Sequence, residues 1–409
     1  MIRLIEAFNY RSLHYVRQPL QDFHILIGPN ASGKTTFLDT VGFLSDLLAK
    51  GLDYAITERS TDIHDLLFLH NGNRFELAVE MEIPKDRLKS LGPNCEYKSI
   101  RYEIAIGVNE ELEENEIFDE QVILSNSITG PKDPKRQWDL FPASMTPPAT
   151  ILHSKNVGRG KKRTVRKVRG GNDNFYSEIE ASKSKGGWTP SIRLGPRKSA
   201  LGNMPDDENR FPATTWLRRL LIDGTQKLML DSLKLRQSSR PGQGRLFKAD
   251  GSNLPRIVES LRQKKDKSDY RRWIKQLQTA LPNIQDVETV ELPDTRHRFL
   301  QIVYQGGLKV PSWTASDGTL RMLALTIPAY IKQFEGIYLI EEPENGIHPM
   351  AMETVYQALR SVYDAQIILA THSPVILGCA ELGEVLCFKK DENGSTDIVN
   401  GLDHPALCL

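Results

Sequence analysis

Gly28-Pro29-Asn30-Ala31-Ser32-Gly33-Lys34-Thr35 is the stretch of sequence that decides the fold. It matches G-x-x-x-x-G-K-[S/T] at every fixed position, follows an apolar run over 23–27 and precedes a helical pattern over 34–50. In this strand–loop–helix context the glycines let backbone N–H groups approach phosphate oxygens, and the helix N-terminus adds a favourable dipole. The pattern therefore predicts a nucleoside triphosphate site, and a chance glycine turn is the alternative that the flanking elements disfavour.

Each loop residue has an expected role in this site. The Lys34 ammonium is predicted to neutralise the β- and γ-phosphates, and the Thr35 hydroxyl is predicted to bind Mg²⁺. The other residues expected to contact ATP are Asn30, Ala31, Ser32, Gly33 and Thr36.

A second apolar run, 337–340, ends in the adjacent carboxylates Glu341 and Glu342. If this strand is parallel to the one before the phosphate loop, its carboxyl end lies on the same side as the metal and the γ-phosphate. Glu341 is then predicted to hold Mg²⁺, and Glu342 to orient and deprotonate the attacking water. A surface glutamate pair at a strand end is the competing interpretation.

A third apolar run, 366–370, leads into Thr371-His372-Ser373-Pro374. A single histidine more often has a structural role than a catalytic one. Because His372 follows another strand end on the same side, we predict that it senses the γ-phosphate.

These motifs resemble those of ABC-type ATPases of the RecF/SMC/OLD branch. The resemblance rests on the phosphate loop, on Ser316-Asp317-Gly318-Thr319-Leu320-Arg321, on E-E-P-E-N-G-I-H-P over 341–349 and on T-H-S-P; Asn9-Tyr10-Arg11-Ser12-Leu13 resembles the first-strand signature of that branch. It covers roughly 1–128 and 285–409. It implies an α/β P-loop NTPase fold, an ABC-type ATPase head with an antiparallel β subdomain and a large mixed or helical insertion.

The same resemblance implies a three-part organisation and a dimer. Residues 1–128 would form the N-terminal lobe, 129–284 an insertion of basic loops and then helices, and 285–409 the C-terminal lobe. Two heads would enclose two ATP molecules, and the residues implied at the nucleotide or the interface are Ser316 and Gly318 (the partner's γ-phosphate), Asn345, the switch histidine His372 and Arg11. An ordinary helix N-cap is the alternative for Ser316, since serine is favoured there.

The sequence departs from the family pattern at three places. Glu341 stands where aspartate is more common, and Asp317 replaces a small signature residue, which predicts slow or activator-dependent hydrolysis. The Q-loop glutamine is not identifiable, and His70 or Asn71 could substitute for it.

Composition excludes several classes of protein. The 409 residues hold 53 Lys+Arg against 52 Asp+Glu, and no apolar run reaches the roughly 18 residues of a membrane span. The N-terminus is charged where a signal peptide needs an apolar core, and the four cysteines lack the spacing of a disulfide framework or a zinc site. We therefore expect a cytoplasmic protein that does not associate with a membrane.

Outside the motifs, the sequence predicts a mixture of strands, loops and helices. Alternating apolar residues at 75–83 and 100–108 predict two half-buried antiparallel strands. The stretch 129–210 is expected to form long loops, helical patterns occupy 213–234, 253–263 and 268–280, and strand patterns follow at 286–292 and 298–304.

Two blocks of opposite charge stand out. Residues 109–120 carry seven acids and no base, and 155–170 carry eight bases and no acid. Such blocks are usually solvated loops, although the basic segment 155–200 could instead bind DNA phosphates.

Two functional hypotheses from different classes remain open. The first is an ATP-dependent sensor and scaffold of a bacterial anti-phage defence system, which controls a separate effector, a nuclease or toxin. We find no nuclease motif, and the sequence after the ATPase motifs is too short for the Toprim domain of OLD nucleases. The second is a RecF- or SMC-like DNA-binding clamp for repair or chromosome maintenance. A transporter ATPase is disfavoured by the style of the motifs.

Overall fold

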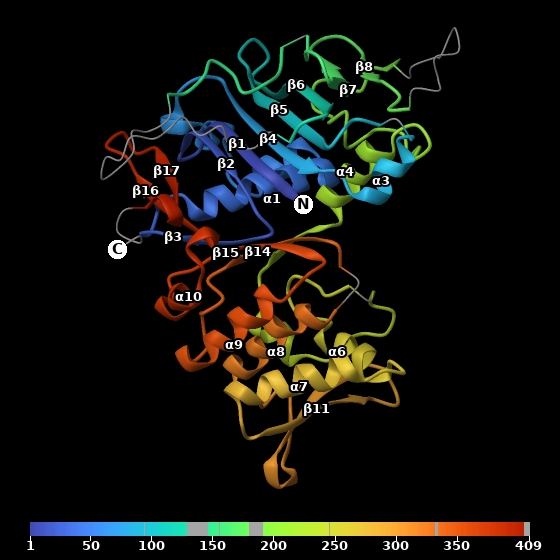
Figure 1. The fold of residues 1–409 in the computed structure, drawn as a ribbon, viewed down its shortest axis with the longest axis vertical. Coiled ribbons are helices and arrows are strands. Elements are labelled where there is room, and N and C mark those ends of the chain that lie inside the picture. The colour runs from blue at the N-terminus through green and yellow to red at the C-terminus, as the bar shows by residue number, and fades with distance from the viewer. Residues whose placement is uncertain are drawn as a thin grey trace. The chain divides into compact units, whose positions relative to one another are not determined.

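The computed structural model describes residues 1–93, 95–128, 146–154, 156–179, 191–244, 246–331 and 334–404 (Figure 1). These residues pack as two units. Unit 1 comprises Met1–Asp22, Gly28–Thr225 and the chain from Leu386 onward, and unit 2 comprises Phe23–Ile27 and Gln226–Val385. The units follow packing rather than the predicted lobes 1–128, 129–284 and 285–409, and those lobes stay a prediction.

Unit 1 is built on an eight-stranded sheet with the order β2-β1-β4-β5-β6-β7-β8-β9. All its neighbouring strands pair antiparallel, which confirms the antiparallel subsheet predicted from the alternating stretches. The strands are β1 (Ile2–Tyr10), β2 (Leu13–Pro19), β4 (Arg74–Glu82), β5 (Ser99–Asn109), β6 (Glu114–Ser125), β7 (Lys161–Val168), β8 (Asp173–Phe175) and β9 (Ser191–Ile192).

The helices of unit 1 include the one that follows the phosphate loop. They are α1 (Lys34–Lys50), α2 (Leu52–Thr57), α3 (Lys85–Ser90) and α4 (Pro212–Ile222). Figure 1 shows α1 running along the sheet near β1 and β4. Phe43 of α1 meets Tyr10 and Phe75 of the sheet, with ring centroids 5.9 and 5.4 Å apart. These edge-to-face contacts anchor the helix to the sheet.

The second face of this sheet is also buried, contrary to the prediction of half-buried strands. Glu76 and Glu103 are fully buried on that face. Glu76 accepts hydrogen bonds from the Thr150 hydroxyl and the Ile151 N–H, both at 2.8 Å, and Glu103 accepts one from the His153 N–H. Residues 150–153 therefore cover the face, and the polar residues of the alternation bind this covering segment instead of water.

Part of the predicted loop region 129–210 is a strand. Residues 161–168 form β7, which pairs with β6 over Asp119–Ser125. Thr164 and Val165 are fully buried, whereas the basic residues around them obscure the strand pattern in the sequence. Residues 129–145, 155 and 180–190 lie outside the described residues.

Unit 2 contains four neighbouring strands in the order β10-β14-β15-β3. Strand β14 (Gly336–Glu341) pairs parallel with β15 (Ala365–Ala370), and β15 pairs parallel with β3 (Phe23–Ile27). The unit also holds the antiparallel strands β11 (Ile284–Glu291), β12 (Arg298–Tyr304) and β13 (Lys309–Pro311) and the helices α5 (Ser232–Arg236), α6 (Leu254–Gln263), α7 (Ser268–Ala280), α8 (Asp317–Thr326), α9 (Pro349–Arg360) and α10 (Pro374–Cys379).

The helices predicted at 253–263 and 268–280 are confirmed as α6 and α7, but the single helix predicted over 213–234 is wrong. The chain forms α4 to Ile222, then strand β10 (Thr225–Leu228), then α5. At Gly224 a Cβ would lie 2.7 Å from the Leu220 carbonyl oxygen. The backbone at Gly224 thus folds back against the last turn of α4, where a side chain would not fit.

The last strands of the chain are the antiparallel hairpin of β16 (Val385–Lys390) and β17 (Thr396–Asn400), which is followed by the 3₁₀ turn Gly401–Asp403. None of the described helices has the length and apolar character that a bilayer crossing demands.

Glu120 of β6 binds a distant segment to the sheet of unit 1. Its fully buried carboxylate accepts hydrogen bonds from the Ser199 hydroxyl and the Ala200 N–H, both at 2.6 Å, and from the Leu201 N–H and the Tyr102 hydroxyl, both at 3.0 Å. Burial raises the pKa of Glu120 even though these donors oppose the shift. The side chain thus satisfies two backbone groups and two hydroxyls that no water reaches.

We expect Glu120→Ala to lower the free energy of unfolding by about 3 kcal/mol, because several buried donors lose their acceptor. Urea unfolding followed by circular dichroism measures the change. Glu114→Ala is the matched control, since Glu114 is exposed on the same strand and should change stability by less than about 0.5 kcal/mol. Equal stability of the two variants would contradict the role of Glu120.

Candidate functional site

The phosphate loop in unit 1 combines two close approaches of the backbone. A Cβ at Gly28 would lie 2.3 Å from the Phe388 carbonyl oxygen, and one at Gly33 would lie 2.1 Å from the Thr396 hydroxyl oxygen. Gly33 also has φ +103°, and Ala31 has φ +60°. Packing against the C-terminal hairpin therefore requires these glycines in addition to any phosphate.

Lys34 and Ser32 face the inside of this loop. The Lys34 ammonium donates to the carbonyl oxygens of Gly28 and Pro29 at 2.8 and 2.9 Å. The Ser32 hydroxyl is buried with no hydrogen-bond partner, whereas the Ser32 carbonyl accepts from the Thr396 hydroxyl at 3.0 Å. An orphaned hydroxyl beside a loop ammonium suits an anionic ligand such as a phosphate.

The remaining loop residues predicted to contact ATP lie toward solvent. Asn30, Ala31 and Thr35 are exposed, and Thr36 is half-buried on the first turn of α1. Thr396, which the sequence analysis did not single out, lies far away in sequence, and no motif signals its contact with Ser32.

Arg11 lies beside α1. Its guanidinium is 3.5 Å from the Asp39 carboxylate, which also accepts a 2.6 Å hydrogen bond from the Tyr10 hydroxyl and pairs with Arg59 at 2.7 Å. Arg11 has φ +50° and Asn9 has φ +57°, so the end of β1 and the turn after it each hold a residue in the left-handed region. Strain of this kind clusters at functional sites. The role of Arg11 in nucleotide contact stays a prediction.

His70 and Asn71, the candidate Q-loop residues, lie next to this turn. The Asn9 side-chain amide donates to the Asn71 carbonyl at 2.9 Å, and His70 has φ +54°. The structure places them beside the β1–β2 turn, and their role as a Q-loop stays a prediction.

In unit 2 the parallel strands bring three chain segments to one sheet edge. Glu341 pairs with Ala370, and Ala370 pairs with Leu26, two residues before the phosphate loop begins at Gly28. The carboxyl ends of β14, β15 and β3 therefore share an edge, as the sequence predicted.

Glu342 has a fixed and strained position at this edge. Its φ is +47°, and its N–H donates to the Ala370 carbonyl at 2.8 Å. The Asn345 side-chain amide donates to the Glu342 carboxylate at 2.7 Å, while Glu342 itself is exposed. A non-glycine residue in this conformation persists only where its surroundings hold it, and the arrangement leaves a carboxylate aimed by an amide.

Glu344, a residue without an assigned role in the sequence analysis, holds the His372 loop. Its carboxylate accepts a hydrogen bond from the His372 N–H at 2.6 Å and from the Thr371 hydroxyl at 2.8 Å. The His372 side chain is exposed. Glu344 belongs to the E-E-P-E run that the sequence analysis singled out, but only the structure shows that its carboxylate binds the His372 loop.

The signature segment combines an N-cap with a close backbone contact. The Ser316 hydroxyl accepts from the Thr319 N–H at 3.2 Å, so Ser316 is an N-cap of α8, as the alternative interpretation had it. A Cβ at Gly318 would lie 2.6 Å from the Gly346 carbonyl oxygen. The start of α8 therefore packs directly on the turn that holds Asn345.

Asp317 turns toward neighbouring side chains of unit 2. Its carboxylate pairs with Arg321 at 2.8 Å and lies 3.9 Å from Arg236. Burial alone would raise its pKa, but hydrogen bonding from Ser232 and the charge of Arg321 hold the pKa of Asp317 below its ordinary value. Asp317, the acid that departs from the family signature, is thus held in its charged form by these neighbours.

Glu341 has a cationic neighbour that the sequence did not reveal. The Lys227 ammonium of β10 lies 2.8 Å from Glu341 Oε1. Among the described residues, no group of three or more His, Cys, Asp or Glu side chains could hold a metal ion. Hydroxyl and carboxylate oxygens suit Mg²⁺, which in nucleotide sites commonly takes one or two protein ligands and completes its shell with phosphates and water. The Thr35 hydroxyl and the Glu341 carboxylate are each a donor of this kind, and their role as ligands of Mg²⁺ stays a prediction.

A family model covers well over half of the chain. The model matches residues 23–125 and 187–378. The family is described as an AAA domain and as a candidate AbiEii toxin of a type IV toxin–antitoxin (TA) system. The chain belongs to this AAA-domain family.

Solved structures similar to this AAA-domain protein include heads of SMC proteins. An Smc head bound to the C-terminal winged-helix domain of ScpA has a TM-score of 0.51 and 14% identity, with 97% of each chain covered. An Smc head with an extended coiled coil, bound to the C-terminal domain of ScpA derived from Pyrococcus furiosus, has a TM-score of 0.51 and 12% identity, with 97% of this chain and 95% of that chain covered. No curated protein matches the sequence.

These similarities confirm the predicted fold class. The AAA-domain protein has the α/β P-loop fold of the ABC-type ATPase head, with an antiparallel β subdomain and an inserted mixed region. At such low identity the SMC heads show the fold alone, and the individual site residues stay predictions.

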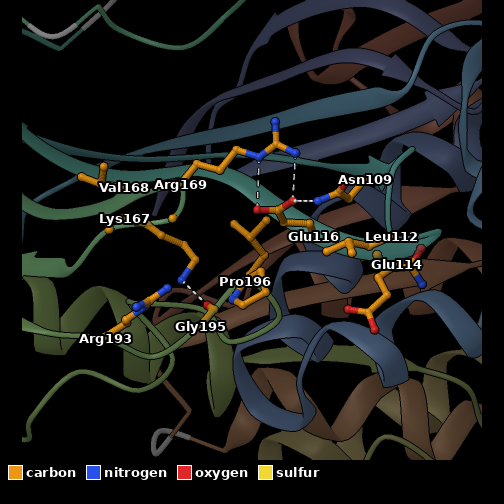
Figure 2. Close-up of a pocket in the computed structure, with 14 residues that line it drawn as sticks. Asn109, Leu112, Glu114, Glu116, Lys167, Val168, Arg169, Arg193, Gly195 and Pro196 are labelled. Atoms are coloured by element: carbon orange, nitrogen blue, oxygen red, sulfur yellow. Dashed lines mark hydrogen bonds and ion pairs between the residues drawn. The ribbon is translucent and has the colours of Figure 1, made fainter.

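The AAA-domain protein also has a pocket away from its phosphate loop, within unit 1 (Figure 2). It encloses about 170 Å³ between the β5–β6 and β7–β8 turns. Arg169 donates to the Glu116 carboxylate at 3.2 and 3.0 Å, Asn109 donates to the same carboxylate at 3.2 Å, and Lys167 donates to the Gly195 carbonyl at 2.7 Å. The acidic and basic blocks of the sequence thus meet here through the ion pair of Arg169 and Glu116.

We expect Gly318→Ala to lower the free energy of unfolding by about 2 kcal/mol, because the new methyl group meets the Gly346 backbone. Thermal unfolding checks this. Gly378→Ala in α10 is the matched control: a Cβ there meets nothing within 4 Å, so stability should stay unchanged or rise by about 0.5 kcal/mol. Similar melting of both variants would disprove the close contact.

Proposed function

We propose that this protein binds ATP at the loop 28–36 and hydrolyses it with Glu342 as the general base. The observation that carries the proposal is the shared sheet edge: β14 ends at Glu341 beside β15, and β15 lies beside the strand that continues into the phosphate loop. Lys34 and the orphaned Ser32 hydroxyl would receive phosphate oxygens. Membership of an AAA-domain family supports this function.

Glu342 is suited to take a proton from water. Its carboxylate is exposed, and the Asn345 amide fixes one of its oxygens, which leaves the other for the attacking water. Glu344 holds the backbone of His372 at the neighbouring strand end, so the imidazole would report on the γ-phosphate. Mg²⁺, held by Thr35 and Glu341, would neutralise charge that develops on the phosphates.

We further propose that two copies close around ATP through the signature segment. Ser316 and Asn345 are exposed, and Gly318 packs on the turn that carries Asn345. ATP bound to one copy would therefore be met by a rigid unit of the other, made of the start of α8 and this turn. Ser316 serves as an N-cap within its own chain, and its position at a helix N-terminus also suits a phosphate from the partner.

The biological role we propose is a cytoplasmic sensor and scaffold in anti-phage defence, which controls a separate effector. Two findings support it: the family description names a toxin of a type IV TA system, and the similar Smc heads are bound to a second protein, ScpA. An ATP-dependent dimer offers a natural switch for an effector, because closure changes which surfaces are available.

We expect Glu342→Gln to trap ATP and hold the dimer closed, since the amide binds ATP but cannot accept the proton. Light scattering after size-exclusion chromatography with ATP and Mg²⁺ should show twice the starting mass, and adding Ser316→Arg should abolish the shift.

We expect Lys34→Ala to lower the affinity for ATP by at least about tenfold, because the loop loses its ammonium. ATP binding that is unchanged in Lys34→Ala would sink the proposed nucleotide site.

The alternative function is a DNA-binding clamp, which the SMC-head fold keeps open. The basic segment supports it less than its sequence suggests, because Lys167 is buried against Asp173 at 3.1 Å and Arg169 pairs with Glu116. DNA binding through many phosphates would weaken steeply with salt.

For the defence role we expect the wild-type protein to bind duplex DNA weakly, with little change when Arg163 and Arg166 are replaced by alanine. Fluorescence anisotropy between about 50 and 200 mM salt measures this. Tight binding that falls by about a thousandfold over this range, and that these substitutions remove, would favour the clamp instead.

A further inference from the structure

We infer that Lys227 is a built-in counter-ion of the metal-binding carboxylate Glu341, which makes metal binding depend on nucleotide. This inference rests on the proposed function, because it concerns the residue proposed to hold Mg²⁺. No sequence motif includes Lys227; the neighbouring positions of β10 and β14 in the sheet bring it to Glu341.

The geometry is that of a direct ion pair. Lys227 Nζ lies 2.8 Å from Glu341 Oε1, and the two side chains are 40% and 24% exposed. The carboxylate is thus the less accessible partner, while the ammonium reaches it from the more solvated side. Lys227 has a flexible stem, so it can withdraw or share the carboxylate when another cation arrives.

Charge decides what this pair does to a metal ion. A divalent cation at Glu341 meets an ammonium a few ångströms away, and the repulsion opposes binding. Without nucleotide, the described residues offer no other cluster of metal-binding side chains to offset it. ATP brings its own phosphate oxygens and negative charge, which compensate for Lys227. The ion pair therefore suppresses metal binding to the empty site and permits binding together with ATP.

The test measures Mn²⁺ binding to the full chain without nucleotide, by electron paramagnetic resonance of free Mn²⁺. We expect Lys227→Met to bind Mn²⁺ about tenfold more tightly than the wild type, because a nearby positive charge is gone. Lys227→Arg keeps the charge and should resemble the wild type. The double variant Lys227→Met, Glu341→Gln should lose the gain.

The matched control is Lys234→Met. Lys234 pairs with Asp250 at 3.0 Å in the same unit, with side chains 48% and 32% exposed. Replacing Lys234 therefore removes the same charge from a similar ion pair elsewhere in the unit. It should bind Mn²⁺ like the wild type. Circular dichroism of each variant verifies folding, and Lys227→Gln replaces Lys227→Met if the latter does not fold.

An unchanged Mn²⁺ affinity in Lys227→Met overturns the inference, and so does an equal gain in Lys234→Met or a gain that survives Glu341→Gln. With ATP present, the difference between Lys227→Met and the wild type should shrink to about threefold or less. ATP binding by the wild type and its loss in Lys34→Ala test the proposed function separately, so failure of one leaves the other distinguishable.

Discussion

The parallel hydrogen bonding of β3, β15 and β14 is the constraint on which the candidate site depends. Parallel strands all end at the same edge, so a register that pairs Ala370 with both Leu26 and Glu341 fixes where three separate segments leave the sheet. One of these segments continues into the phosphate loop, one begins with two glutamates and one carries His372. Residues more than 300 positions apart thereby serve one edge, and a slip of one register position would move every one of these side chains.

Hydrogen bonds from the chain itself then fix the residues that leave this edge. Asn345 orients Glu342, Glu344 holds the His372 backbone, and Gly346 lies so close to Gly318 that no side chain fits there. The turn after β14 therefore connects the proposed base, the proposed sensor and the signature segment within unit 2. A change in any one of them has a short physical route to the other two through atoms in direct contact.

Several charged residues of unit 1 have structural partners. The basic block around β7 finds Glu116 and Asp173, and the buried carboxylates of the eight-stranded sheet bind the backbone of a covering segment. A buried carboxylate without donors would be costly, so each of these groups also selects the segment that lies over it.

The sequence by itself determined the phosphate loop, the two glutamates after an apolar strand and the antiparallel subsheet, because glycine spacing and apolar alternation are local signals. It also predicted α6 and α7, whose apolar faces repeat with the helical period. It misjudged residues 161–168 within the predicted loop region, where basic side chains with distant partners hid β7. It also misjudged 213–234, where Gly224 ends a helix. The contacts of Lys227, Glu344 and Thr396 could be decided only by the tertiary structure, because their partners lie far along the chain and strand order alone brings them together.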